Sequence, residues 1–102
     1  MLSVMPEILE GAGQRQQTTE EPPYRVIIYN DPVTPMDFVV IVLRQIFLLS
    51  GPRAVQVMYT AHINNSAYVQ TLPRSEAQRR IHRAHFTSRL QGFPLSFTLE
   101  QE

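Results

Sequence analysis

The stretch YRVIIYNDPVTPMDF, from Tyr24 to Phe38, decides how this chain folds. Its first six residues are β-branched or aromatic apart from one arginine, which predicts a strand over Tyr24–Tyr29. Asn30-Asp31-Pro32 follows, and these residue types favour a turn that ends the strand. The strand is therefore expected to lead directly into a polar loop.

The second half of the stretch predicts the start of a helix. Thr34 is expected to cap the helix, Pro35 suits the first helical position, and Asp37 completes a capping box. A carboxylate in the first turn also favours the positive end of the helix dipole. One short loop thus places an amide, a carboxylate and a hydroxyl beside the thioether of Met36.

The rest of the chain predicts four more elements after this first helix. The first helix is expected over Pro35–Leu49, although the residues Phe38–Leu43 taken alone favour a strand, and Ser50-Gly51-Pro52 ends it. Gly92 is expected to end the last helix. The later elements are a helix over Pro52–Ile63, a strand over Ala67–Leu72, a helix over Pro73–Gln91 that buries Ala77, Ile81 and Ala84, and a strand over Pro94–Leu99.

Length and composition indicate a small globular protein. The chain has 102 residues, 43% of them hydrophobic, and a formal net charge of zero. We expect one domain over residues 23–102, preceded by a flexible arm over residues 1–22 that is rich in Gly, Gln and Thr. The chain has no cysteine, which excludes disulfides, thiol nucleophiles and thiolate metal sites. No segment resembles a secretory signal, and the longest apolar run is too short to span a bilayer.

Three separated motifs in the chain resemble those of ClpS, a small adaptor family. They are Asn30-Asp31-x-x-Thr34-Pro35-Met36-Asp37-Phe38, Ala54-x-x-x-Met58-x-x-x-His62 and Pro94-Leu95-x-x-Thr98-Leu99-Glu100. The similarity runs without interruption over roughly Pro23 to Glu100. It implies an α+β fold of order β-α-α-β-α-β, in which three helices pack on a small antiparallel three-stranded sheet.

The resemblance also implies a function. ClpS adaptors bind proteins with destabilising, large hydrophobic N-terminal residues (N-degrons) and deliver them to a Clp AAA+ unfoldase and protease. The expected partners are therefore N-degron substrate proteins and the N-domain of a ClpA- or ClpC-type unfoldase, without a cofactor, a nucleic acid or a membrane. The expected location is the cytoplasm, or the plastid stroma if the protein is organellar.

The chemistry of a free amino terminus explains the kind of site that is needed. An ammonium group has three donors, so its receptor must offer converging acceptors, at least one of them charged. The resemblance assigns this task to Asn30, Asp31 and His62. It assigns the hydrophobic pocket for the first side chain to Thr34, Met36, Met58, Ala61 and Leu95.

The third helix is basic and carries the expected docking surface. Five of the nine basic residues lie on it, with Glu76 as the only acid. Where the family has Thr, Glu and Lys for docking, the aligned residues here are Pro73, Ser75 and Arg80. We expect docking to use Ser75, Arg79, Arg80 and Arg83. The alternative interpretation is a basic module that binds nucleic acid or an acidic protein through this helix.

An enzyme is the remaining class of function. Asp31 and His62 could supply two members of a hydrolytic triad, but the chain has no cysteine and no serine in a nucleophile elbow. His82 and His85 have a spacing found in metal sites, but no third ligand completes them. We therefore expect a non-catalytic protein without a metal site.

Two departures from the family pattern lie close to the expected ligand. Pro32 stands where a second Asp is usual, and Ala61 stands where Val is common. We expect weaker preferences at the second ligand residue and a roomier pocket for the first.

Overall fold

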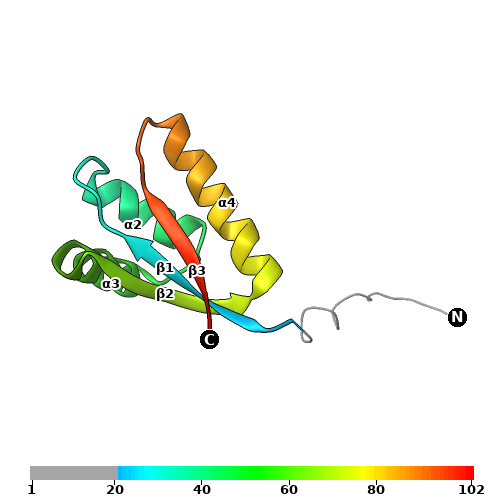
Figure 1. The fold of residues 1–102 in the computed structure, drawn as a ribbon. Coiled ribbons are helices and arrows are strands. Elements are labelled where there is room, and N and C mark those ends of the chain that lie inside the picture. The colour runs from blue at the N-terminus through cyan, green and yellow to red at the C-terminus, as the bar shows by residue number, and fades with distance from the viewer. Residues whose placement is uncertain (1–20) are drawn as a thin grey trace, which may run out of the picture.

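The structure, a computed structural model, describes residues 21–102. The elements are β1 (Pro23–Tyr29), α2 (Met36–Gln45), α3 (Gly51–Asn64), β2 (Ser66–Pro73), α4 (Arg74–Leu90) and β3 (Ser96–Gln101) (Figure 1). The predicted order is confirmed, and most boundaries lie within two residues of the expected ones. Residues 1–20 of the predicted arm lie outside the described residues, so the division into arm and domain stays a prediction.

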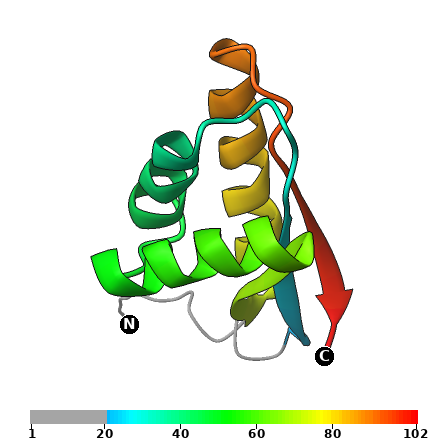
Figure 2. The same ribbon diagram turned by 90° about the vertical axis from the view of Figure 1, so that its left-hand side faces the viewer.

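The three strands form an antiparallel sheet in the order β2-β1-β3, as predicted. Ile28 on the central strand lies opposite Ala67 on β2 and Phe97 on β3. The helices cover one face of this sheet (Figure 2). Because side chains alternate along a strand, Val26 and Ile28 point into the core, while Tyr29 faces the other side.

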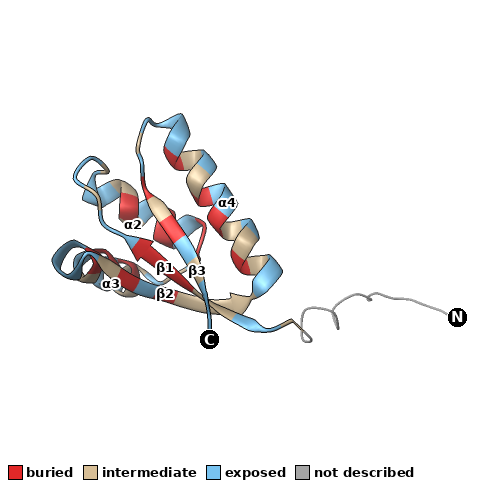
Figure 3. Cartoon of the chain, in the orientation of Figure 1, coloured by how far each residue is buried: buried red, intermediate tan, exposed pale blue. Residues whose placement is uncertain are grey.

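The hydrophobic core lies between the sheet and the helices, where Figure 3 shows the buried positions. Phe47, from the segment after α2, is completely buried, and its ring stacks on that of Phe97 with centroids 4.8 Å apart. The prediction that α4 buries Ala77, Ile81 and Ala84 is confirmed.

The start of α2 differs from the sequence prediction. The N-cap is Pro35, without a side-chain cap, and the helix begins at Met36. A capping box would pair the backbone N–H of Thr34 with the Asp37 side chain, but this N–H donates to Asp31 instead, and so does the Thr34 hydroxyl. Asp37 instead accepts the N–H of Phe38. The predicted capping box is wrong because Asp31, a charged acceptor in the preceding turn, takes the N–H of Thr34 that the box would need.

The first helix is also shorter than predicted, since it ends at Gln45 rather than Leu49. The N–H groups of Ile46 and Phe47 both donate to the carbonyl of Val42, and Leu48 has a positive φ of 61°. This break turns the Phe47 side chain into the core. Burial of a large aromatic ring outweighs the few tenths of a kcal/mol per residue that helix propensity contributes.

The last strand begins at Ser96, two residues later than expected. Ser96 pairs with Tyr29, and beyond Tyr29 the central strand turns away into the Asn30 loop. Pro94 and Leu95 therefore lie outside the sheet. Gly92 ends α4 as predicted, with φ at 79° and the N–H of Phe93 donating to the carbonyl of Ser88.

Candidate functional site

A pocket of about 300 Å³, part of which is open solvent, lies where β1 ends. Its walls come from the loop after β1, the start of α2, the end of α3 and the segment before β3. The residues that line it are Ile28, Tyr29, Asn30, Asp31, Thr34, Met36, Val39, Met58, Ala61, His62 and Leu95. These include every residue that the resemblance assigned to amine binding and to the hydrophobic pocket. Their roles in binding stay predictions.

The Asp31 carboxylate organises the loop that forms one side of the pocket. Its Oδ1 accepts the N–H groups of Val33 at 2.9 Å and Thr34 at 2.7 Å, and its Oδ2 accepts the Thr34 hydroxyl at 2.8 Å. A carboxylate that bonds to backbone N–H groups two and three residues later forms an Asx turn. The loop therefore holds Asp31 in a single position at the pocket edge.

The electrostatics of Asp31 favour its charged form. Desolvation by burial raises its pKa, but the hydrogen bonds from Thr34 and Val33, together with the nearby Arg89 charge, outweigh it. The net result is a pKa below the usual value of an aspartate. The pocket thus has a negatively charged acceptor at neutral pH.

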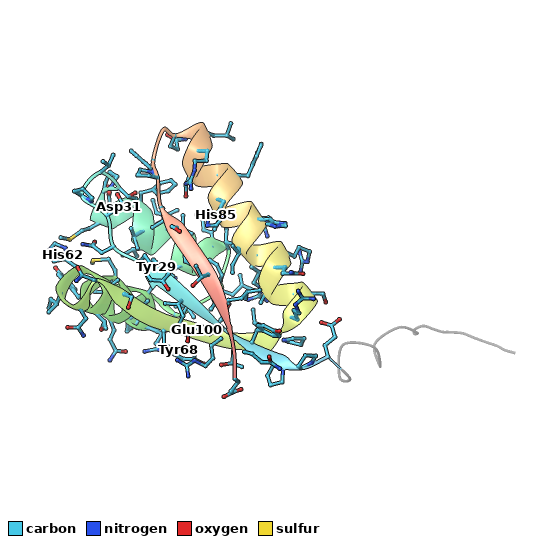
Figure 4. The ribbon with its side chains drawn as sticks, viewed as in Figure 1. Tyr29, Asp31, His62, Tyr68, His85 and Glu100 are labelled. Carbon is cyan, nitrogen blue, oxygen red and sulfur yellow. The ribbon has the colours of Figure 1, made fainter. Side chains whose placement is uncertain are left out.

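The end of α3 brings His62 to the same place. Asn65, in the left-handed conformation with φ at 73°, ends α3, and its carbonyl accepts the N–H of Asn30 at 2.9 Å. This bond ties the end of β1 to the end of α3. Asp31 and His62 accordingly lie at the same end of the molecule (Figure 4). His62 is exposed, one helical turn beyond Met58.

The pocket changes from polar at its rim to apolar at its base. Ile28, Ala61 and Leu95 are at most 3% exposed, and Met58 is 8% exposed. Met36 is 41% exposed and lies at the opening. An ammonium group at the rim would meet oxygen and nitrogen acceptors, while a neighbouring apolar side chain would enter the base.

Three lining residues were missed by the sequence reasoning, namely Ile28, Tyr29 and Val39. Val39 lies three residues after Met36, so helical spacing alone could have placed it on the same face. Ile28 and Tyr29 directly precede Asn30, but a strand pattern does not indicate which residues border a pocket.

A shallower hollow continues from the pocket over the loop and includes Pro32 and Val33. It shares Asp31 and His62 with the deeper pocket. The two departures from the family pattern thus occupy different places, since Ala61 lines the deep pocket and Pro32 lines the hollow beside it.

The predicted docking residues on α4 divide into inward-facing and outward-facing groups. Arg80 has a side chain only 16% exposed, and it donates to Glu76, to Gln70 and to the carbonyl of Phe47. Its guanidinium therefore holds α4 against β2 and the end of α2. Arg79 and Arg83 are exposed, although Arg79 pairs with Glu76.

The start of α4 carries a further contact that the sequence did not predict. The N–H and the hydroxyl of Ser75 both donate to the Glu21 carboxylate, each at 2.8 Å. These two bonds lower the pKa of Glu21 below its usual value. The last part of the predicted arm is thus attached to the first turn of α4.

Two large apolar side chains, Phe86 and Leu90, are exposed on α4 at 66% and 69%. They were also missed, because the sequence reasoning considered the buried apolar positions and the charged residues of this helix but not its exposed apolar side chains. They lie one helical turn apart, so they share a face.

Among residues 21–102, no three His, Asp or Glu side chains gather as potential metal ligands. Within the same residues, no helix has the length and hydropathy needed to cross a membrane.

Comparison with known proteins relates the sequence and the fold of this chain to one family. The family model described as "ATP-dependent Clp protease adaptor protein ClpS" matches residues 19–98. The adapter protein ClpS 2 of Mesorhizobium japonicum is 37% identical over 100 residues, which cover 96% of this chain and 99% of that protein. ClpS of Xanthomonas campestris pv. campestris is 37% identical over 87 residues, covering 85% and 82%.

A solved structure shows the same fold. The structure of Agrobacterium tumefaciens ClpS2 bound to L-phenylalaninamide matches with a TM-score of 0.77 and 37% identity, covering 81% of this chain and all of that one. The family model, the relatives and the solved structure agree with one another, and the chain belongs to the ClpS family of Clp protease adaptors.

Proposed function

We propose that this chain binds the free amino terminus of proteins that begin with a large apolar residue and delivers these proteins to a Clp unfoldase and protease. The observation that carries the proposal is the pocket in which Asn30, Asp31 and His62 border an apolar base. The similar ClpS2 structure, which holds L-phenylalaninamide, supports it, because that ligand combines a free amine with an aromatic side chain.

The pocket chemistry suits both parts of such a ligand. The Asp31 carboxylate offsets the charge of the ammonium, and Asn30 and a neutral His62 accept its remaining donors. The first side chain then replaces water against Met58, Ala61 and Leu95. Because thioethers adapt their shape, Met36 and Met58 can accommodate both aromatic and branched side chains.

A fluorescence titration tests this binding. A labelled peptide that begins with Phe should bind, a Leu peptide should bind comparably, and an Ala peptide should bind much more weakly. Acetylation of the Phe peptide should abolish binding, because it removes the positive charge and two donors. Equal binding of the acetylated and free peptides would show that the amine is not recognised.

Delivery requires a docking surface outside the pocket. We propose that the exposed side of α4, with Ser75, Arg79 and Arg83, contacts the N-domain of a ClpA- or ClpC-type unfoldase in the cytoplasm. Arginines pair well with carboxylates on a partner. Arg80 would support this surface from inside rather than contact the partner, since its guanidinium already has acceptors within the fold. The adaptor itself would catalyse no reaction.

The segment before the described residues is proposed to act in delivery. Deletion of residues 1–20 should leave peptide affinity unchanged and stop degradation of a Phe-initiated substrate by the unfoldase and protease. The deletion must keep Glu21, because its carboxylate bonds to Ser75. Loss of peptide affinity in this variant would mean that the arm belongs to the binding domain.

The alternative of a nucleic-acid-binding helix has less support. Arg80 and Arg89 direct donors to acceptors inside the fold, and Arg79 pairs with Glu76, which reduces the positive charge that α4 presents. A labelled oligonucleotide in the same titration tests it. Binding that weakens steeply with salt would restore this alternative.

A further inference from the structure

Arg89, near the end of α4, holds the chain segment that carries one wall of the pocket. Its Nη1 donates to the carbonyl of Phe93 at 3.0 Å and to the carbonyl of Leu95 at 2.9 Å. Leu95 itself is 1% exposed and lines the pocket. One side chain outside the pocket lining thus bonds to the backbone of a residue within it.

The segment from Phe93 to Leu95 has no support from the sheet, because pairing between β1 and β3 begins at Ser96. The Leu95 side chain packs in the core, and the start of the segment is held where the N–H of Phe93 donates to Ser88 and the Phe93 ring meets Phe38 edge-on, with centroids 4.9 Å apart. Packing thus fixes the Leu95 side chain, whereas its carbonyl is held by the hydrogen bond from Arg89.

A second α4 side chain holds the chain just beyond Leu95. His85 lies on α4 beside β3 (Figure 4), and its Nε2 accepts the N–H of Phe97 at 3.0 Å, which requires a neutral imidazole. Burial, followed by the charges of Arg89 and His82, lowers the pKa of His85 and favours that neutral form. Side chains of α4 thus form hydrogen bonds to the backbone on both sides of Leu95.

We propose that Arg89 is a positioning residue that sets the selectivity of the pocket for the first ligand side chain, by fixing the backbone of Leu95. The inference rests on the proposed function. Since Leu95 packs at the base of the pocket, a small displacement changes which side-chain shapes fit. Discrimination between side chains that differ by one methylene is worth about tenfold or more in well-packed pockets.

The test compares Arg89→Met and Arg89→Lys with the wild type. Peptides that begin with Phe, Leu and Ile, each with a free amino terminus, are titrated against every protein. The measured quantity is the ratio of the largest to the smallest of the three dissociation constants, here called the spread. A variant that is merely less stable loses the same factor of affinity for all three peptides, because the unfolded fraction binds none of them. The spread therefore reports the shape of the pocket and not the stability of the fold.

We expect the spread to narrow by about tenfold in Arg89→Met, the effect of one packing contact in a pocket. In Arg89→Lys, whose shorter side chain retains the charge and can still donate, the spread should be intermediate. Arg74→Met is the matched control, because this substitution removes the same charge from the same helix. Arg74 lies at the other end of α4, near the ring of Tyr24. Its spread should equal that of the wild type.

Other outcomes overturn the inference in separable ways. A uniform loss of affinity with the spread unchanged would show that Arg89 acts only through its charge or through stability. Equal binding of all three peptides by the wild type would leave no selectivity for Arg89 to set. If Arg89→Met does not fold, Arg89→Lys decides the question, and a wild-type spread in it refutes the role. Failure of the wild type to distinguish free from acetylated peptide would instead refute the proposed function.

Discussion

Replacing Asp31 by Asn and by Ala separates the two tasks that we assign to this carboxylate. Asp31 shapes the loop through three hydrogen bonds from Val33 and Thr34, and we propose that it also holds the ligand ammonium. Asn keeps a side-chain oxygen for the two backbone N–H groups, and its amide can donate to the Thr34 hydroxyl. Ala keeps none of these bonds. Both variants lose the negative charge.

The expected magnitudes differ for stability and for binding. Each of the three bonds contributes a net of about 0.5–1.5 kcal/mol, so Asp31→Ala should lower the free energy of unfolding by about 1.5–4.5 kcal/mol. At about 4–8 °C per kcal/mol for a domain of this size, the Tm should fall by at least about 6 °C. Asp31→Asn should change the free energy of unfolding by less than about 1 kcal/mol. Loss of a charged acceptor should cost both variants about 1.5–3 kcal/mol of binding, or roughly 10- to 150-fold in Kd.

Thermal unfolding followed by circular dichroism and titration of a labelled Phe-initiated peptide measure the two effects. Asp37→Asn is the matched control, because Asp37 loses the same charge on the first turn of α2 but lines neither the pocket nor the hollow beside it. Wild-type affinity in Asp31→Asn would refute the contact between carboxylate and ammonium. Equal destabilisation by Asn and Ala would refute the account of the loop.

Three further predictions concern other parts of the site. His62→Ala should weaken peptide binding by roughly two- to tenfold, the effect of one neutral acceptor, and leave the Tm unchanged because His62 is exposed; an unaltered Kd would remove His62 from the contacts. Ala61→Val should change the differences in binding free energy among Phe, Leu and Ile peptides by about 1–3 kcal/mol and so alter their rank order, since Ala61 is 3% exposed in the pocket. An unchanged order would contradict this. Burial lowers the pKa of His85 in the folded state below its ordinary value of 6.5, so the unfolded state binds more protons below that pH. The free energy of unfolding should therefore decrease as the pH drops below 6.5 and become constant below the folded-state pKa. Urea unfolding of wild type and His85→Gln across that range measures the effect, which should be smaller in the variant.

Local sequence signals were sufficient for the order of elements and for most of their ends. Gly92 ends α4 because glycine adopts a positive φ at little cost, and this preference is a property of the residue itself. Alternating and helical apolar patterns likewise placed Ala77 and Ile81 in the core. The pocket residues were identified because three separate motifs matched one family in order, whereas no single residue among them indicates a pocket.

Long-range contacts decided what these local signals could not. The first helix ends early because Phe47 packs against Phe97, fifty residues further along the chain. Arg80 has the same local sequence character as its exposed neighbour Arg79, yet it turns inward to acceptors on β2 and after α2. Arg89 reaches the carbonyl of Leu95 only because Gly92 reverses the chain. A basic side chain has no intrinsic preference between solvent and such acceptors, so its direction follows from which acceptors the fold places within its reach.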